Sequence, residues 1–322
     1  MAKSRKLEEL TTAFNQIRHD PTSEMAIATL HQILTSKYGI IVAQAAHLIG
    51  EFEMHRFVPD LVAAFSRFML NAKDSDPGCR AKQAIAETLY RLNYSDEALF
   101  LQGIHHVQLE PVWGGQVDTA PRLRGTCALG LVRMNYSQVM VELADLLADS
   151  DPEARIGAAR AIAYSGNDQG IPLLRLRVKV GDTTPVLSEC LIALLTLAPV
   201  PTLPLIQTLL YHYTQQDSPE TLEKAEATAL ALAESRRPEA LDILREWWQQ
   251  VRNRDVRRTG LLAIATLRHD SALEFLCTLV EQGTASDARD AIKALSIYQH
   301  DTSLWERVRQ LADQREDSVK AD

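Results

Sequence analysis

The stretch Asp149–Gly166 reads DSDPEARIGAARAIAYSG and predicts a turn that leads directly into a helix. Asp151 is placed to cap the helix N-terminus, and Pro152 takes the first helical position, where its missing N–H leaves no hydrogen bond unmade. Gly166 suits the left-handed conformation that ends many helices. Because the side chains in between are mostly small, a second helix can approach this one closely. The stretch therefore indicates one helix of a packed helical pair.

The same pattern recurs along the chain, which indicates a repeat array. Proline opens a predicted helix at intervals of 44, 31, 33 and 34 residues, at Pro77, Pro121, Pro152, Pro185 and Pro219. We predict a single solenoid over residues 1–313 with about eight helical pairs. A leading helix near residues 3–18 and a trailing helix near 302–313 would cap the array, and the polar tail 314–322 is expected to fray.

The motif of an Asp-Pro turn, an arginine three residues after the proline and an Ala-Ala pair resembles the HEAT repeat. The resemblance covers about residues 22–313 and implies an all-α fold, a right-handed α-solenoid. The Arg- and Ala-rich repeats also resemble the sub-type seen in phycobilisome lyases. In HEAT-like arrays such arginines typically pair with turn aspartates, which suggests a structural ladder: Arg80 with Asp76, Arg124 with Asp118, and Arg155 with Asp151.

Composition limits the possible functions. The net charge is −8, which argues against a protein that binds nucleic-acid phosphates over its whole surface. The four cysteines, at positions 79, 127, 190 and 277, lack metal-ligand spacing, and we interpret them as buried fillers in a reducing cytoplasm. The charge-free segment 190–216 is interrupted by prolines, so we expect two buried helices there and no membrane span. The alternating segment 174–180 is expected to be helical despite its period of two.

The loop Gln108–Ala120, QLEPVWGGQVDTA, lengthens one repeat and contains Trp113 beside Gly114 and Gly115. Long loops in compact arrays often carry function, and an aromatic side chain next to glycines is a plausible contact element. The alternative is that Trp113 folds back and seals the gap that the insertion makes. The sequence leaves both interpretations open.

The run Arg245–Arg258, REWWQQVRNRDVRR, combines arginines with two tryptophans, a combination that can bind phosphates or stack on bases. Adjacent helix positions point about 100° apart, so one of Trp247 and Trp248 must lean toward the core. We favour a solvated face whose charges are partly paired.

No catalytic motif, metal site or cofactor site is predicted, since GxSxG, P-loop, GxGxxG and His-Glu patterns are missing from the sequence. The leading hypothesis is a scaffold or adaptor that binds another protein along its concave face. The alternative that the resemblance implies is a bilin lyase or chromophore chaperone. Nucleic-acid binding is the least favoured.

In a HEAT array the second helices line the concave side, so residues displayed there define the expected contact face. In the first half these are arginines: Arg122, Arg133 and Arg160. In the second half the corresponding residues are glutamates: Glu189, Glu220 and Glu223. The predicted partner-binding residues are the three arginines together with Trp113, Gly114 and Gly115.

Overall fold

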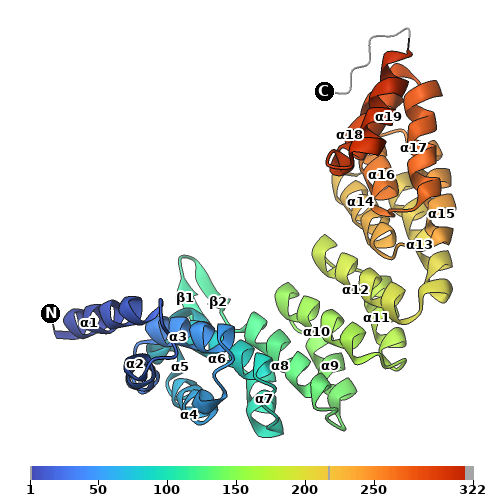
Figure 1. Cartoon of the computed structure of the whole chain (residues 1–322). Coiled ribbons are helices and arrows are strands. Elements are labelled where there is room, and N and C mark those ends of the chain that lie inside the picture. Colours follow the sequence, from blue (N-terminus) through green and yellow to red (C-terminus); the bar gives the residue numbers. More distant parts are fainter. Residues whose placement is uncertain (1, 217, 316–322) are drawn as a thin grey trace. The chain divides into compact units, whose positions relative to one another are not determined.

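The computed structural model describes residues 2–216 and 218–315, and nearly all of this part of the chain is helical (Figure 1). The first helices are α1 (Ala2–Ile17), α2 (Glu24–Leu34), α3 (Gly39–Glu51), α4 (Val58–Met69), α5 (Ala72–Ser75), α6 (Arg80–Arg91), α7 (Glu97–Ile104), α8 (Pro121–Arg133), α9 (Val139–Leu147) and α10 (Pro152–Ser165). The later ones are α11 (Gly170–Val180), α12 (Thr184–Leu197), α13 (Pro199–Gln216), α14 (Pro219–Glu234), α15 (Pro238–Gln250), α16 (Arg254–Thr266), α17 (Asp270–Gln282), α18 (Ala285–Leu295) and α19 (Thr302–Asp313). Short 3₁₀ turns lie at His55–Phe57, Pro77–Cys79 and Ser296–Tyr298.

These helices pack in pairs, which confirms the predicted all-α solenoid class. The pairs are α2 with α3, α4 with α6, α7 with α8, α9 with α10, α11 with α12, α13 with α14, α15 with α16, and α17 with α18. Helices α1 and α19 begin and end within a residue or two of the predicted end helices, and their role as caps of the array stays a prediction. The predicted frayed tail falls mostly at residues 316–322, outside the described residues.

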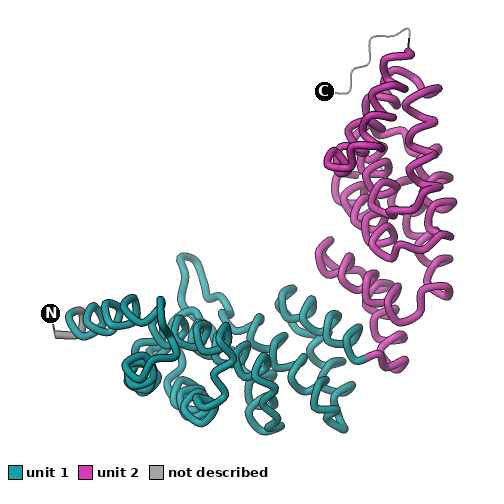
Figure 2. The backbone as a smooth tube through the Cα atoms, in the orientation of Figure 1, with its two compact units in different colours: residues 1–165 teal, residues 166–322 magenta. Residues whose placement is uncertain are grey.

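The chain divides into two compact units, residues 1–165 and 166–322 (Figure 2). Within the first unit the second helices of consecutive pairs stack as α3, α6, α8 and α10, and within the second as α12, α14, α16 and α18. The cores of both units consist mainly of Leu, Ala, Ile and Val side chains from facing helices. Each pair therefore buries its apolar surface against its neighbours in the stack.

The stretch Asp149–Gly166 folds as its sequence predicts. Asp151 Oδ1 accepts a hydrogen bond of 2.8 Å from the backbone N–H of Glu153, so Asp151 does cap this end of α10. Gly166 has a φ of 62°, the left-handed conformation expected after the last helical residue. The close approach occurs where Gly125 of α8 faces Gly157 of α10: a Cβ at Gly157 would lie 2.6 Å from the Gly125 Cα.

Two further expectations about helices are confirmed. Residues 174–180 lie within α11, and the charge-free segment 190–216 forms most of α12 and all of α13 with a break at Ala198. Among the described residues, we find no helix with the length and hydropathy that a bilayer span requires.

Arginines also hold consecutive repeats together by binding helix C-termini. Arg67 of α4 donates to the carbonyls of Leu34 and Ser36, at the end of α2. Arg133 of α8 donates to the carbonyls of Tyr90 and Tyr94, at the end of α6. The last carbonyls of a helix have no partner within the regular helix, so these guanidinium groups supply donors there; the Tyr90 carbonyl also accepts from the Asn93 backbone N–H at 3.1 Å.

The contact between Gly125 and Gly157 is testable by adding one methyl group. Gly157→Ala should lower the free energy of unfolding by about 1–3 kcal/mol, because the new Cβ overlaps backbone atoms of α8. Helix propensity alone would favour alanine by about 1 kcal/mol, so a loss of stability reports the steric overlap. Gly115→Ala, where a Cβ has open space, is the control in chemical denaturation. A Gly157→Ala protein as stable as the parent would contradict the close packing of α8 and α10.

Candidate protein-binding surface

The inserted loop forms a β-hairpin, a structure that the sequence analysis did not predict. Strands β1 (Leu109–Val112) and β2 (Gly115–Asp118) pair antiparallel (Figure 1). The turn between them contains Trp113 and Gly114, and Gly114 has a φ of 86°, which glycine adopts without strain. Trp113 is fully exposed. It therefore does not fold back to seal a gap, and that alternative is wrong.

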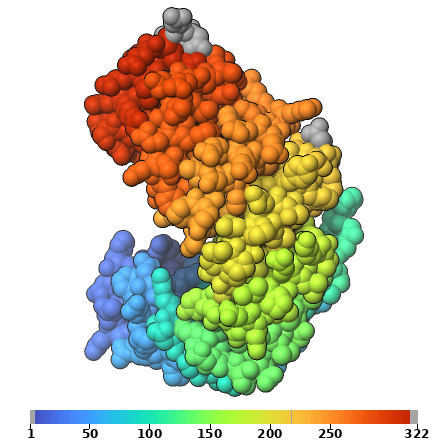
Figure 3. Space-filling model, turned by 90° about the vertical axis from the view of Figure 1, so that its right-hand side faces the viewer, coloured from blue at the N-terminus to red at the C-terminus, as the bar shows by residue number. Residues whose placement is uncertain are grey.

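The hairpin projects from the first unit as a ridge, visible at the right edge of Figure 3 in the teal-green of its residue numbers. Its root is fixed by Glu110, whose Oε1 accepts hydrogen bonds from three donors. These are the Gly78 backbone N–H at 2.6 Å, the Gln108 Nε2 at 2.6 Å and the Thr119 hydroxyl at 2.9 Å. Partial burial opposes ionisation of Glu110, but these hydrogen bonds outweigh it and lower the pKa of the carboxyl group.

Arg124 joins the hairpin to the next repeat. The buried guanidinium lies 2.6 Å from Asp118 Oδ2 at the end of β2 and 2.9 Å from Asp149 Oδ2 before α10. It also donates to the His106 carbonyl at 3.0 Å. The ladder partner that the resemblance suggested for Arg124, Asp118, is thus found, and Asp149 is a second acceptor that the sequence analysis missed.

The suggested pair of Arg80 with Asp76 is wrong. Asp76 is buried and binds Lys82 Nζ at 2.9 Å, and its two oxygens accept from the backbone N–H groups of Ala81 and Lys82. Arg80 is exposed. The turn residues Gly78 and Cys79 both have positive φ, so the backbone departs from the helical path just before Arg80 and Lys82 takes the inward position.

Arg155 of α10 forms hydrogen bonds to the backbone of its own repeat. Its Nη1 donates to the carbonyls of Asp149 at 2.7 Å and Ser150 at 3.0 Å, in the turn that precedes its own helix. Together with Arg124, this arginine fixes the turn that contains Asp149.

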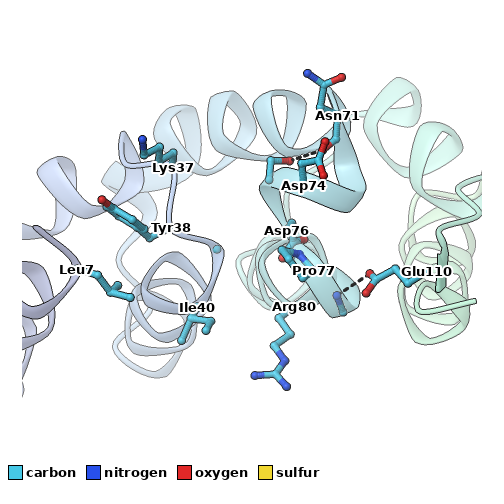
Figure 4. A pocket seen from close by; sticks show the side chains of 13 residues that line it. Leu7, Lys37, Tyr38, Ile40, Asn71, Asp74, Asp76, Pro77, Arg80 and Glu110 are labelled. Carbon is cyan, nitrogen blue, oxygen red and sulfur yellow. Dashed lines mark hydrogen bonds between the residues drawn. The ribbon is translucent and has the colours of Figure 1, made fainter. Parts of the chain in front are cut away.

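A pocket of about 720 Å³ opens in the first unit between α1, the start of α3 and the turn that precedes α6 (Figure 4). Leu7, Lys37, Tyr38 and Ile40 lie on one side of it; Asn71, Asp74, Asp76, Pro77 and Arg80 lie on the other. Glu110 reaches it from the hairpin, with its hydrogen bond to Gly78 drawn in the figure. A second pocket of about 400 Å³, lined by residues of α3, α6 and α8, shares Ile40 and Arg80 with the first.

The predicted contact arginines have different environments. Arg122 is exposed and lines the second pocket. Arg160 is exposed on α10. Arg133 is only half-exposed, because its guanidinium binds the end of α6 and lies 4.3 Å over the Tyr90 ring. Arg133 thus holds two repeats together, a role that the sequence analysis did not anticipate; its Tyr90 and Tyr94 partners lie 43 and 39 residues away in the chain.

In the second unit, the expected negative face contains Glu220, which forms an ion pair of 2.7 Å with Lys224. Its charge is therefore partly offset by a neighbour one helical turn away.

The run Arg245–Arg258 does not offer tryptophans for stacking. Trp247 and Trp248 are both buried, whereas the sequence required only one of them to face the core. Trp247 donates to the Thr214 hydroxyl at 2.9 Å, and the Trp248 ring packs against Phe275 and beneath Arg257. Four of the five arginines pair with carboxylates in the same unit: Arg245 with Asp242, Arg254 with Asp290, Arg257 with Asp287, and Arg258 with Asp255 and Asp290. This agrees with the expected face of exposed and partly paired charges.

All four cysteines are buried, as predicted. Burial raises the pKa of the Cys79 thiol to about 12, so it is protonated at neutral pH. Within residues 2–216 and 218–315, we find no cluster of three or more His, Cys, Asp or Glu side chains that could hold a metal ion.

Comparisons with known proteins agree with this fold. Residues 206–296 match a model of HEAT repeats. This match shows HEAT repeats in residues 206–296, a segment within the second unit, and it does not show the phycobilisome-lyase sub-type. No curated protein sequence matches the chain.

Among solved structures, the chain is similar to one in a homology model of the full-length AP-3 complex in an intermediate open conformation, with 15% identity and a TM-score of 0.50. The alignment covers 93% of this chain and 50% of that chain, so this chain spans half the length of its relative. Human deoxyhypusine hydroxylase in complex with glycerol gives 14% identity, a TM-score of 0.29 and coverage of 91% of each chain. An engineered protein gives 16% identity and a TM-score of 0.36, and the alignment covers 98% of this chain and 91% of that chain. At these identities the AP-3 likeness concerns the fold alone.

Arg124, the buried arginine at the hairpin root, should contribute strongly to the free energy of unfolding. Arg124→Ala should lower the free energy of unfolding by about 3–5 kcal/mol, because two carboxylates lose their shared cation in a largely desolvated place. Arg122→Ala removes the same charge from an exposed position two residues earlier and should change stability by less than about 0.5 kcal/mol. Equal effects of the two substitutions in thermal and chemical denaturation would contradict the structural role of Arg124.

The lowered pKa of Glu110 predicts a pH window for the hairpin root. A folded pKa below the unfolded value means that the stabilisation is present above the unfolded pKa and is lost as the pH falls through the folded pKa. The Gly78 amide proton should therefore titrate in NMR spectra with a midpoint below about 4.3, the ordinary glutamate value. Glu110→Gln should remove this titration. A midpoint at or above the ordinary value would show that the three hydrogen bonds do not form in solution.

Proposed function

We propose that the protein is a non-enzymatic interaction scaffold, in which another protein contacts the second-helix face of the first unit and the tip of the hairpin. The observation that carries the proposal is Trp113: a fully exposed tryptophan at the end of a hairpin whose root is hydrogen-bonded to Gly78 in the preceding repeat and to Arg124 of α8. We also propose a cytoplasmic location; the four free, buried cysteines are in keeping with a reducing compartment.

The energetics of binding support this role for the hairpin. Tryptophan is among the residues most enriched at the centres of interfaces, because one large rigid side chain buries much area at a low cost in conformational entropy. Glu110 and Arg124 already hold the hairpin root in one place, so a partner would order little additional backbone on binding. Exposed Leu109, Val112 and Val117 add apolar surface beside the tryptophan.

The arginines of the first unit provide the charged part of the surface. Arg122 and Arg160 are exposed on consecutive second helices, α8 and α10, and Gly114 and Gly115 let the partner approach the hairpin tip closely. Exposed charges of this kind steer association and set its salt dependence more than its final affinity. Arg133 supports the surface indirectly by fixing the end of α6.

The test is photo-crosslinking from a single position. A photoreactive benzophenone amino acid at Trp113 should give adducts of discrete mass in lysate of the native cell. The same amino acid at Val141, an exposed apolar position on α9 of the same unit, should give none. Excess parent protein should suppress the adducts, and excess Trp113→Ala protein should suppress them at least 10-fold less well, since loss of a central tryptophan typically costs at least about 2 kcal/mol. Equal labelling from both positions, or none from Trp113 in a folded protein, would contradict the proposal.

A further inference from the structure

The backbone hydrogen bonds of the hairpin determine which of its polar groups point away from the sheet. In an antiparallel pair, residue pairs that exchange backbone hydrogen bonds alternate with pairs whose N–H and C=O groups point outward. The Thr119 N–H donates to the Gln108 carbonyl at 3.0 Å, one step before the first pair of the sheet. Counted from this bond in steps of two, the hydrogen-bonded pairs are Glu110 with Val117 and Val112 with Gly115. The outward-facing pairs are Leu109 with Asp118 and Pro111 with Gln116.

The outer edge of β1 is closed to a further strand. Pro111 occupies one of its two outward-facing positions, and proline has no backbone N–H to donate. Proline at such a position is a common means by which proteins keep an edge strand from pairing with another chain. Strand addition at β1 is therefore disfavoured.

The outer edge of β2 is open. Gln116 and Asp118 each direct an N–H and a C=O outward, and neither backbone forms a hydrogen bond to another element of the described chain. Gln116 is exposed. The Asp118 carboxylate turns toward Arg124, so its charge is compensated at the hairpin root. Four backbone groups, spaced two residues apart, are thus available along β2.

One face of the hairpin adds apolar surface beside this edge. Side chains that are directly opposite, or two apart on one strand, share a face of the sheet. Val117 is paired with Glu110, and Val112 lies two residues along β1 from Glu110, so both valines lie on the same face. Val112 is 50% exposed and Val117 is 44% exposed. A strand beside β2 would therefore bring a side chain next to Val117.

The spacing of these groups specifies an extended polypeptide as the occupant. Donors and acceptors that alternate along a strand edge are matched by the backbone of another β-strand, which is how peptides add to exposed sheet edges. A second copy of this chain is a poor occupant, because an edge of four residues falls far short of the roughly 20–30 residues a side in a stable interface. A partner that also contacts Trp113 and the second helices needs only part of its interface here.

We propose that the β2 edge binds an extended segment of the partner protein as a third strand. Two alternate residues of that segment pair through their N–H and C=O groups with Gln116 and Asp118. The residue between them is β-branched or aromatic and packs against Val117. This inference rests on the proposed scaffold function and specifies how the backbone of the partner is recognised.

The experiment is a selection from a random 12-residue peptide library displayed on phage, with the full-length chain immobilised. The parent chain should enrich peptides in which Val, Ile, Phe or Tyr alternates with other residues and proline is missing from the alternating stretch. Gln116→Pro removes an outward N–H and places a ring carbon at the edge, so it should lose these peptides. The matched control is Gln116→Ala, which removes the same side chain, keeps the N–H and should select as the parent does.

The position of Gln116 keeps the proline variant informative. Gln116 faces Pro111 in a pair without backbone hydrogen bonds, so proline there removes no bond of the sheet. The Gly78 amide, which donates to Glu110 at the hairpin root, should keep its NMR chemical shift in both variants. A changed shift in Gln116→Pro alone would show that the root is altered, and the scan below then decides without any variant of the chain.

A scan of N-methylated peptides tests the backbone contacts on the parent chain. A synthetic peptide from the parent selection is methylated at one backbone nitrogen at a time, and its affinity is measured by fluorescence anisotropy. Methylation of alternate residues should weaken binding about 10-fold or more, because each methyl group removes one N–H and leaves an acceptor of β2 without a donor. Methylation of the intervening residues should have a much smaller effect. With the unmodified peptide bound, the amide protons of Gln116 and Asp118 should exchange with solvent about 10-fold more slowly.

The outcomes separate this inference from the scaffold proposal. Peptides without an alternating pattern, equal selection by Gln116→Pro and Gln116→Ala when the root is unaltered, or a methylation scan without a period of two would overturn strand addition. A dimer of the chain alone in light scattering, abolished by Gln116→Pro, would assign the edge to a second copy and overturn it as well. Adducts from the Trp113 position would still support the scaffold in each case. If those adducts are also missing, both proposals fail.

Discussion

The pairing of arginine with the polar groups of the turns is the interaction on which this architecture depends. Each helix is short, so a large fraction of its backbone carbonyls lie in the last turn, where no intrahelical donor is available. Arg67 and Arg133 supply donors from the following repeat, and Arg124 and Arg155 hold the turn at Asp149. These contacts set the register between repeats. The Leu- and Ala-rich core supplies most of the buried apolar area, but hydrophobic burial is non-directional and does not by itself fix how the helices are oriented.

The same kind of interaction fixes the root of the hairpin and leaves its tip exposed. The hairpin root is fixed by Arg124 and Glu110, both of which face inward. The tip carries Trp113 with no contact that would order it from within the described chain, and the pocket that Glu110 reaches from the hairpin is lined by exposed Ile40 and Arg80. Polar groups of the insertion are thus satisfied at its base, and its apolar groups remain available at its end. That division is what distinguishes this insertion from an ordinary loop between repeats.

Residues that look equivalent in the repeat pattern differ in role because their local backbones differ. Arg80, Arg124 and Arg155 all stand three residues after a helix-opening proline. Arg124 is buried between two aspartates, but Arg80 is exposed and Lys82 takes its place beside Asp76. The cause is the left-handed turn at Gly78 and Cys79, which shifts the start of α6 past the proline. Similarly, Arg133 looks like a contact residue by its position but binds the end of α6.

The sequence by itself determined the class of fold, the helical pairs, the two end helices and the capping at Asp151 and Gly166, because helix periodicity and capping depend on residues within one turn of each other. It also pointed to the insertion around Trp113. Only the tertiary structure decided that the insertion is a hairpin with an exposed tip, that Lys82 replaces Arg80 beside Asp76, and that a pocket opens at Ile40. Those features join groups tens of residues apart, such as Glu110 and Gly78, and their contacts depend on how whole helices pack.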